Sequence, residues 1–244
     1  GCEAAWQLAQ AGYAVFLYEM KPEQYTPAHH YTGLAELVCS NSLKADRLAS
    51  AAGLLKAEME RLGSLLIPCA RATAVAALAV DRHRFSDLVT EHIQNHPNIT
   101  IIQERVTALP KRCAVIATGP LTDGALAEDL ERQCGKRLSF FDAAAPIVSY
   151  ESLDPEKIFF AARYDRGDAD YINCPMTKDE FFAFYHQLIA GETVALHAFE
   201  KEIYFEGCMP IEAMAKRGYK TLTFGPLKPV GLEKEDGTRP FAVV

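Results

Sequence analysis

The chain has 244 residues, of which 49% are hydrophobic, and a formal net charge of −7 at pH 7. This length and apolar content are enough for one large or two small globular domains, and we expect two. The acidic balance argues against partners that are recognised through overall positive charge. A nucleic-acid or anionic-membrane partner would therefore need a local basic patch.

Seven cysteines are scattered along the chain. They form no Cys-x-x-Cys pair and no paired Cys/His spacing, and their number is odd, which argues against a disulfide framework and a zinc site. We therefore expect reduced thiols, a cytoplasmic protein and no metal. No apolar run approaches the roughly 20 residues that a membrane helix needs, so we expect no membrane partner.

The first pattern along the chain is a helix followed by a buried strand. Apolar and small residues recur on one helical face up to Gly12, and the apolar run at residues 14–18 ends in Glu19. This order is typical of a dinucleotide-binding unit, in which a glycine turn approaches the pyrophosphate and an acid binds the adenosine ribose. Gly1 would be the last glycine of that turn, so we expect the chain to start inside a larger unit. The alternative is an ordinary α/β pair with a solvated Glu19.

Residues 21–42 show little periodicity and contain several Pro, His and Ser residues, which predicts a long loop, and the apolar cluster of Leu34, Leu37 and Val38 predicts that the loop is ordered. Its adjacent histidines, His29 and His30, cannot both face one metal, and no third ligand is near in the sequence. An amphipathic helix is predicted at residues 48–62, with its leucines in the core and Gly63 as its end. A strand, a helix and a strand are then predicted at residues 77–80, 85–93 and 99–102.

An unbroken apolar run at residues 113–117 stops at Thr118 and Gly119 and predicts a fully buried parallel strand that ends in a sharp turn. A glycine there lets the backbone sit close to a ligand. A strand that ends in Ala-Thr-Gly downstream of a ribose-binding acid is a recurrent second contact in flavoproteins, so with Glu19 it favours a flavin site. This strand and residues 14–18 should lie in one sheet.

The sequence becomes less regular after Pro120, which predicts a domain boundary between residues 1–120 and 121–244. In the second part, Thr177 and Glu180 predict a capping box at the start of a helix. The aromatic side chains of that helix recur at helical spacing, which is far more often a core than a platform for nucleic-acid bases.

Cys208 stands immediately before a predicted helix start, with Pro210 suited to the first helical position. A helix N-terminus favours thiolate over thiol and lowers a cysteine pKa, which makes Cys208 a candidate nucleophile. The alternative is a small buried side chain in a tight turn, and spacing alone favours that alternative.

Several segments carry a specific resemblance that runs nearly from end to end. They are LYEMKP, TPAHH, AELVCSNSLKAD, LAVDRHRFS, VIATGPLT, ARYDRGDADYINCPMTK, FEGCMPIEAMAKRG and TLTFGPLKPVGL. With these segments the chain resembles the folate- and FAD-dependent tRNA uracil-5-methyltransferases of bacteria, the TrmFO family. AELVCSNSL and FEGCMPIE are long, ungapped and unusual strings, which argues against chance similarity.

The resemblance implies an α/β fold, with a glutathione-reductase-type, Rossmann-like FAD-binding domain at residues 1–120 and a smaller α+β insertion domain at 121–244. It implies methylation of uridine C5 in the T-loop of tRNA, so that the T-arm is the partner. The one-carbon unit would come from methylenetetrahydrofolate, with FAD as cofactor and NAD(P)H as reductant. The residues that match flavin-binding segments are Gly1, Glu19, Lys21, Thr118 and Gly119. Cys39 and Cys208 match the two functional cysteines.

Two thiols suit this chemistry. C5 of uracil is a poor nucleophile until a thiolate adds at C6 and creates an enolate, and a second group must then remove the C5 proton. We favour Cys208 as the nucleophile and Cys39 as the assisting thiol near the flavin. The reverse assignment stays open.

The chain departs from the family in three places. It lacks the first strand and two glycines of the fingerprint, it ends at Val244 where relatives continue, and it has Val75 and Ala76 where a glycine pair is expected. We expect weaker FAD binding than in an uncut relative. The alternatives are a non-catalytic fragment or tRNA-binding remnant, and a related flavoprotein that modifies the tRNA wobble uridine, which FEGCMPIE fits poorly.

Overall fold

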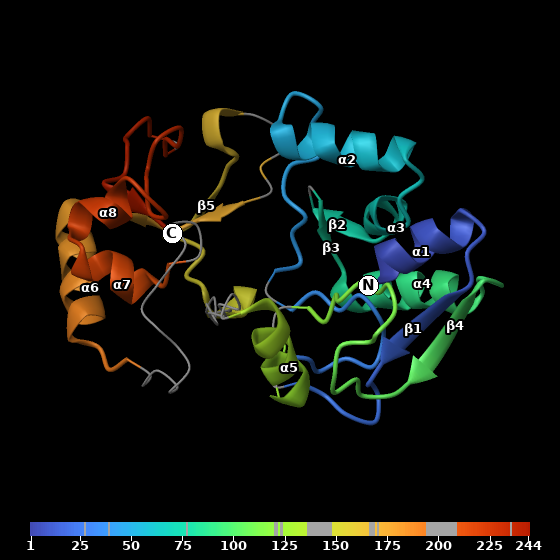
Figure 1. Cartoon of the computed structure of the whole chain (residues 1–244). Coiled ribbons are helices and arrows are strands. Elements are labelled where there is room, and N and C mark those ends of the chain that lie inside the picture. Colours follow the sequence, from blue (N-terminus) through green and yellow to red (C-terminus); the bar gives the residue numbers. More distant parts are fainter. Residues whose placement is uncertain are drawn as a thin grey trace. The chain divides into compact units, whose positions relative to one another are not determined.

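Figure 1 shows the computed structural model of the chain. It describes residues 1–26, 28–38, 40–76, 78–119, 122, 124–135, 148–165, 169, 171–193, 209–234 and 236–244. The chain divides into two compact units, Gly1–Phe140 and Phe141–Val244. No helix in these described ranges is long and apolar enough to cross a membrane. The functional domains at 1–120 and 121–244 stay a prediction.

The first unit mixes helices and short strands. In chain order its elements are α1 (Cys2–Gln10), β1 (Val15–Glu19), α2 (Ala51–Arg61), α3 (Leu66–Ala72), β2 (Ala74–Ala76), β3 (Ala79–Val80), α4 (Arg82–Gln94), β4 (Ile99–Gln103) and α5 (Gly124–Cys134). β1 and β4 are a parallel pair, and β2 and β3 an antiparallel one. The predicted first helix, the helix predicted at 85–93 and the strands predicted at 14–18 and 99–102 are present as α1, α4, β1 and β4. The burial predicted for the strand at 14–18 is wrong, because Phe16 and Tyr18 are exposed.

Local sequence explains where these helices begin. The Asp81 side chain accepts hydrogen bonds from the backbone N–H groups of His83 and Arg84, and Ser50 accepts one from Gly53 N–H. Capping side chains of this kind satisfy N–H groups that the first turn of a helix leaves without partners. α4 and α2 therefore start at those residues.

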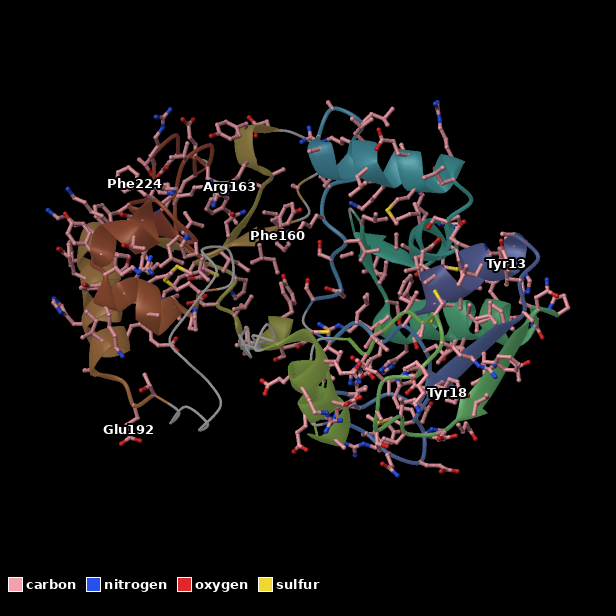
Figure 2. The ribbon with its side chains drawn as sticks, viewed as in Figure 1. Tyr13, Tyr18, Phe160, Arg163, Glu192 and Phe224 are labelled. Carbon is pink, nitrogen blue, oxygen red and sulfur yellow. The ribbon has the colours of Figure 1, made fainter. Side chains whose placement is uncertain are left out.

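The core of the first unit lies between α1, α3, α4 and the β1–β4 pair. Val80, Val89 and Ile93 are fully buried there. Burial of one such side chain contributes roughly 1.5–3 kcal/mol. On β1 the alternation is strict, because Val15 and Leu17 pack on this core whereas Phe16 and Tyr18 are exposed. Tyr18 is labelled in Figure 2.

The strand predicted at residues 113–117 is wrong. These residues form no strand, and Val115 is 65% exposed. Among the described residues, β1 pairs only with β4, so the two apolar runs do not share a sheet. An apolar run becomes a buried strand only where neighbours take up its N–H and C=O groups.

The apolar face predicted for residues 48–62 is also wrong, although the helix is present as α2. Leu48 and Leu62 are 68% and 76% exposed, and the buried residues of α2 are Gly53 and Lys56. Lys56 Nζ donates to the carbonyls of Ala45 and Ala52. α2 therefore packs on the preceding loop through its backbone and a lysine, and its leucines face outward.

The second unit contains short helices and antiparallel strand pairs. Its elements are η1 (Tyr150–Ser152), β5 (Phe159–Phe160), η2 (Arg163–Asp165), β6 (Ile172–Asn173), β7 (Pro175–Met176), α6 (Lys178–Ala190), α7 (Ile211–Lys216), α8 (Tyr219–Thr223) and β8 (Ala242–Val243). β5 pairs with β6 and β7 with β8, both antiparallel. Its assignment as an insertion domain stays a prediction.

The capping box of α6 is confirmed, since Thr177 Oγ1 accepts from Glu180 N–H and the Glu180 carboxylate accepts from Thr177 N–H. The aromatic stripe of α6 is core, as predicted. Phe181 is fully buried, and the centroids of the Phe181 and Phe241 rings are 5.3 Å apart. Pro210 stands at the N-cap of α7, one position before the predicted one.

Candidate functional site

Gly1 lies at the N-cap of α1, where the first intrahelical hydrogen bond joins Ala5 N–H to the Gly1 carbonyl. The N–H groups that precede Ala5 have no partner within the helix. They point outward beyond its N-terminus, which is the positive end of the helix dipole. A β-carbon at Gly1 would lie 3.8 Å from the Ala117 carbonyl oxygen. The start of α1 therefore lies beside the segment that leads into Thr118 and Gly119.

Glu19 is the last residue of β1 and is only partly exposed. Its Oε1 accepts a hydrogen bond from the Lys21 backbone N–H at 3.0 Å. A carboxylate can accept several hydrogen bonds, so Oε2 is available to other donors. Glu19 is thus oriented at the carboxyl end of a parallel strand, where ligands of α/β sheets bind.

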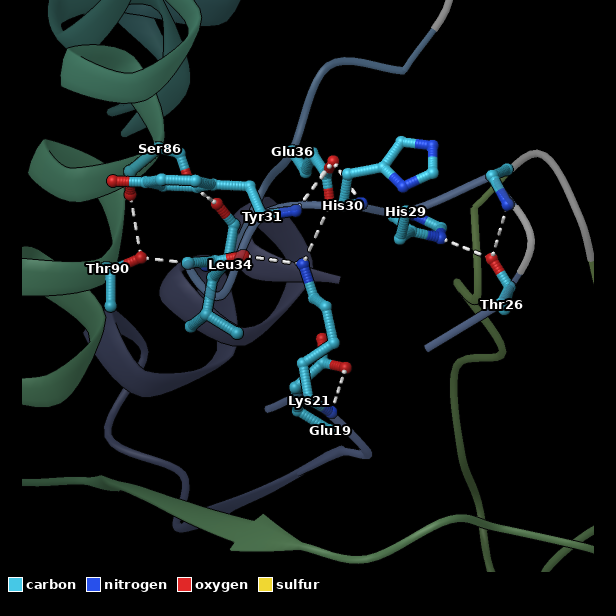
Figure 3. Close-up of polar contacts among 12 residues, drawn as sticks. Glu19, Lys21, Thr26, His29, His30, Tyr31, Leu34, Glu36, Ser86 and Thr90 are labelled. Carbon is cyan, nitrogen blue, oxygen red and sulfur yellow. Dashed lines mark hydrogen bonds and ion pairs between the residues drawn. The ribbon is translucent and has the colours of Figure 1, made fainter. Parts of the chain in front are cut away.

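Lys21 is 6% exposed and holds the following loop (Figure 3). Its Nζ donates to the Gly33 carbonyl at 2.6 Å and pairs with Glu36 Oε2 at 3.3 Å. The side chains of Lys21 and Glu36 are 5% and 12% exposed. The charge of Lys21 is therefore directed into the loop, and its predicted role in cofactor binding stays a prediction.

The Glu36 carboxylate binds the backbone of the loop at His30 and Tyr31. Its Oε1 accepts from the backbone N–H groups of His30, at 2.8 Å, and Tyr31, at 3.1 Å. Burial by itself would raise the pKa of Glu36, but the His30 hydrogen bond and the Lys21 cation outweigh it and hold the pKa below its ordinary value. Glu36 is consequently an anion at neutral pH.

Two hydroxyl groups of α4 fix the middle of the loop. Leu34 N–H donates to Thr90 Oγ1 at 2.8 Å, and Ser86 Oγ donates to the Leu34 carbonyl at 2.5 Å. A β-carbon at Gly33 would collide with Ser86 Oγ and come within 3.1 Å of Tyr31. We call residues 21–38, of which Pro27 is not described, the braced loop.

His29 links the braced loop to the predicted flavin turn. Its Nδ1 lies 2.6 Å from Thr26 Oγ1, and its Cε1 and Nε2 lie 3.5 Å from where a β-carbon of Gly119 would stand. Gly119 has a φ of +85°, and the hydroxyls of Thr118 and Thr122 share a hydrogen bond of 2.5 Å. Burial lowers the pKa of His29.

Among the described residues of the predicted site, the structure shows two separate contacts. Gly1 adjoins the segment of Thr118 and Gly119, and Glu19 is hydrogen-bonded to Lys21. Cys39 and Cys208 lie outside the described residues. Within the part of the chain that the structure describes, no cluster of three His, Cys, Asp or Glu side chains could hold a metal.

Sequence reasoning did not assign roles to His29, Gly33 and Glu36. His29 and Glu36 stand inside the TPAHH and AELVCSNS strings, but single polar residues in an aperiodic loop have no pattern that separates a buried partner from a solvated side chain. The strings themselves were the signal that could have found them.

A family model described as glucose inhibited division protein A matches residues 1–242. Three curated relatives are named methylenetetrahydrofolate-tRNA-(uracil-5-)-methyltransferase TrmFO. Those of Anoxybacillus flavithermus, Shouchella clausii and Bacillus pumilus are 58%, 57% and 55% identical over 100% of this chain. The chain spans 58%, 57% and 57% of their lengths. The resemblance drawn from the sequence is confirmed.

Proposed function

The chain belongs to the glucose inhibited division protein A family, and from this premise we propose that it carries out part of the flavin-dependent methylation of a tRNA uridine. The proposed enzyme transfers a one-carbon unit from methylenetetrahydrofolate to C5 of a T-loop uridine, in the cytoplasm, with FAD as cofactor and NAD(P)H as reductant. The observation that carries this proposal is the 55–58% identity to TrmFO relatives along the whole chain.

Residues 1–120 are proposed as the glutathione-reductase-type FAD-binding domain and residues 121–244 as the insertion domain. The parallel β1–β4 pair, with α1 and α4 packed on one face, supports the first assignment. Such a pair with its crossover helices is the repeating unit of dinucleotide-binding folds.

The residues around Gly1 fit an FAD molecule. The N–H groups at the start of α1 have no partner within the helix and suit the pyrophosphate. Gly1 and Gly119 place no side chain of their own at this end of the helix, and the neighbour of Gly119 is the His29 ring. Glu19 Oε2 suits the ribose hydroxyls, and the Lys21 N–H bond keeps the carboxylate oriented. When bound, FAD would supply the redox chemistry and carry the one-carbon unit.

Two cysteines carry the covalent chemistry in this proposal. The Cys208 thiolate adds to uracil C6, and C5 then attacks the electrophilic one-carbon unit. The Cys39 thiolate accepts the C5 proton, the C6–sulfur bond breaks and releases the Cys208 thiolate, and NAD(P)H supplies the electrons that complete the methyl group. Both lie outside the described residues. The described residues on either side of Cys39 are anchored, since Glu36 pairs with Lys21, and Asn41 exchanges hydrogen bonds with Val80.

The test is methylation of a T-arm RNA in the presence of FAD, methylenetetrahydrofolate and NADPH. We expect Cys208→Ala to lose both methylation and the covalent complex with a 5-fluorouridine RNA, because the nucleophile is absent. Cys39→Ala should lose methylation and keep the covalent complex. The matched control is Cys113→Ala, since Cys113 is exposed and outside the site.

Full methylation by both Cys39→Ala and Cys208→Ala would contradict the proposal, and the reversed complex pattern would exchange their roles. RNA binding without methylation by the unmutated chain would favour the alternative of a non-catalytic, tRNA-binding chain. Modification at the wobble uridine would favour the other alternative.

A further inference from the structure

The Thr26 hydroxyl orients the His29 imidazole. Thr26 is 6% exposed, and its Oγ1 accepts from Ala28 N–H at 3.3 Å while lying 2.6 Å from His29 Nδ1. The hydroxyl can donate to Nδ1 or accept from Nδ1–H, and we assign it as the donor to the neutral ring. The neutral imidazole then carries its proton on Nε2.

Nε2 lies at the edge of the imidazole that faces Gly119. The ring atoms Nε2 and Cε1 are both 3.5 Å from the place where a β-carbon of Gly119 would stand, so any larger residue at 119 would contact the imidazole. Gly119 is two residues from Ala117, which adjoins Gly1 at the start of α1. Consecutive Cα atoms are about 3.8 Å apart, so two residues span at most about 7.6 Å. His29, Gly119 and the α1 N-terminus therefore line one short stretch of surface.

The surroundings of His29 carry charges of both signs. Glu36 and Glu19 favour the imidazolium, whereas Lys21 and His30 disfavour it, and burial disfavours it most. The net effect is a neutral imidazole at neutral pH. A ligand that brings two phosphate charges to this surface would shift the balance toward the cation.

We infer that His29 is a further residue of the flavin site, and that its Nε2–H donates a hydrogen bond to the pyrophosphate of FAD while Nδ1 binds a proton from solvent. This inference rests on the proposed function. When Nδ1 is protonated, the Thr26 hydroxyl keeps its hydrogen and rotates, and Oγ1 then accepts a hydrogen bond from Nδ1–H of the imidazolium. FAD binding is thereby coupled to the uptake of a proton, and affinity falls as pH rises.

The experiment is calorimetric titration of the chain at pH 7 with FAD, in buffers that differ in ionisation enthalpy. We expect uptake of about half a proton or more per FAD, and an affinity that falls several-fold, up to about tenfold per pH unit, between pH 6 and pH 8. His29→Gln keeps a hydrogen-bond donor but cannot titrate, so it should show no uptake and a flat pH profile. His30→Gln is the matched control, because the His30 side chain is exposed, and it should behave as the unmutated chain.

Two further ligands need no variant and separate pyrophosphate from the rest of the cofactor. ADP-ribose, which has the pyrophosphate diester and no flavin, should also drive proton uptake, whereas riboflavin, which has no phosphate, should not. Uptake with riboflavin, or equal uptake in His29→Gln, would overturn the inference while leaving FAD binding in place. Absence of FAD binding by the unmutated chain would overturn the proposed function and this inference together.

Discussion

Two irregular segments of the first unit differ in how many contacts they make with the rest of the unit. The braced loop has no helix or strand among its described residues, yet Lys21, Thr26 and Leu34 are buried in it. Residues 111–119, which we call the exposed segment, are exposed throughout, and residues 111–117 make no hydrogen bond to other described residues. The difference teaches that a few polar partners, placed on neighbouring elements, order a chain more effectively than apolar residues without a neighbour.

The largest effect should come from removing the cation that holds the braced loop. Lys21→Met leaves Glu36 as a buried charge without its partner, so we expect a loss of about 3 kcal/mol in the free energy of unfolding. Unfolding in urea, followed by fluorescence of Trp6, reports this, because Trp6 is the single tryptophan and lies in α1. The double variant Lys21→Met/Glu36→Gln should recover part of the loss. An unchanged midpoint in Lys21→Met would show that the loop is not held by this pair.

A side chain at Gly33 should loosen the loop through overpacking. Gly33→Ala places a β-carbon against Ser86 Oγ, and we expect a loss of about 2 kcal/mol. The matched control is Gly12→Ala, which meets open space and costs about 1 kcal/mol because of its φ of +86°. Equal losses in both variants would mean that the contact with Ser86 contributes nothing.

Acid should lower the free energy of unfolding of the unmutated chain more than that of a variant that lacks the Glu36 carboxylate. The folded pKa of Glu36 is lowered, so its contribution is present above the unfolded carboxyl pKa of about 4.3 and is lost as pH falls through the lower folded value. The stability of the unmutated chain should therefore fall more steeply below about pH 5 than that of Glu36→Gln. Parallel pH profiles of the two midpoints would contradict the ion pair.

The smallest effect should come from the exposed segment. Val115→Ala removes two methyl groups from a 65% exposed side chain, so we expect a change within about 0.5 kcal/mol. Val89→Ala, the same substitution in the buried face of α4, should cost about 2 kcal/mol. Equal costs would place Val115 in a core, as the sequence had predicted.

Much of the first unit could be predicted because its patterns are local. α1 and α4 follow from helical periodicity, and β1 and β4 follow from short apolar runs. Residues 113–117 and the leucines of α2 were predicted wrongly, because their burial depends on which elements pack beside them. Periodicity gives the apolar face of an element and says nothing of its partner.

The candidate site shows the same division. The places of Gly1 at a helix start and of Glu19 at a strand end follow from local sequence, whereas their roles in FAD binding, and that of Gly119, stay predictions. His29 and Glu36 acquire their surroundings from the path of the loop, and that path depends on contacts with Lys21 and α4 that are distant in sequence.

Hydrogen exchange of the unmutated chain, read by mass spectrometry of peptides from both segments, tests the contrast between them most directly. The account predicts slow exchange at the N–H groups of His30, Tyr31 and Leu34, which bond to Glu36 and Thr90, and fast exchange across residues 113–117. Fast exchange in the braced loop together with slow exchange in residues 113–117 would contradict the account. It would mean that the apolar run is the ordered segment and that the polar contacts do not order the braced loop.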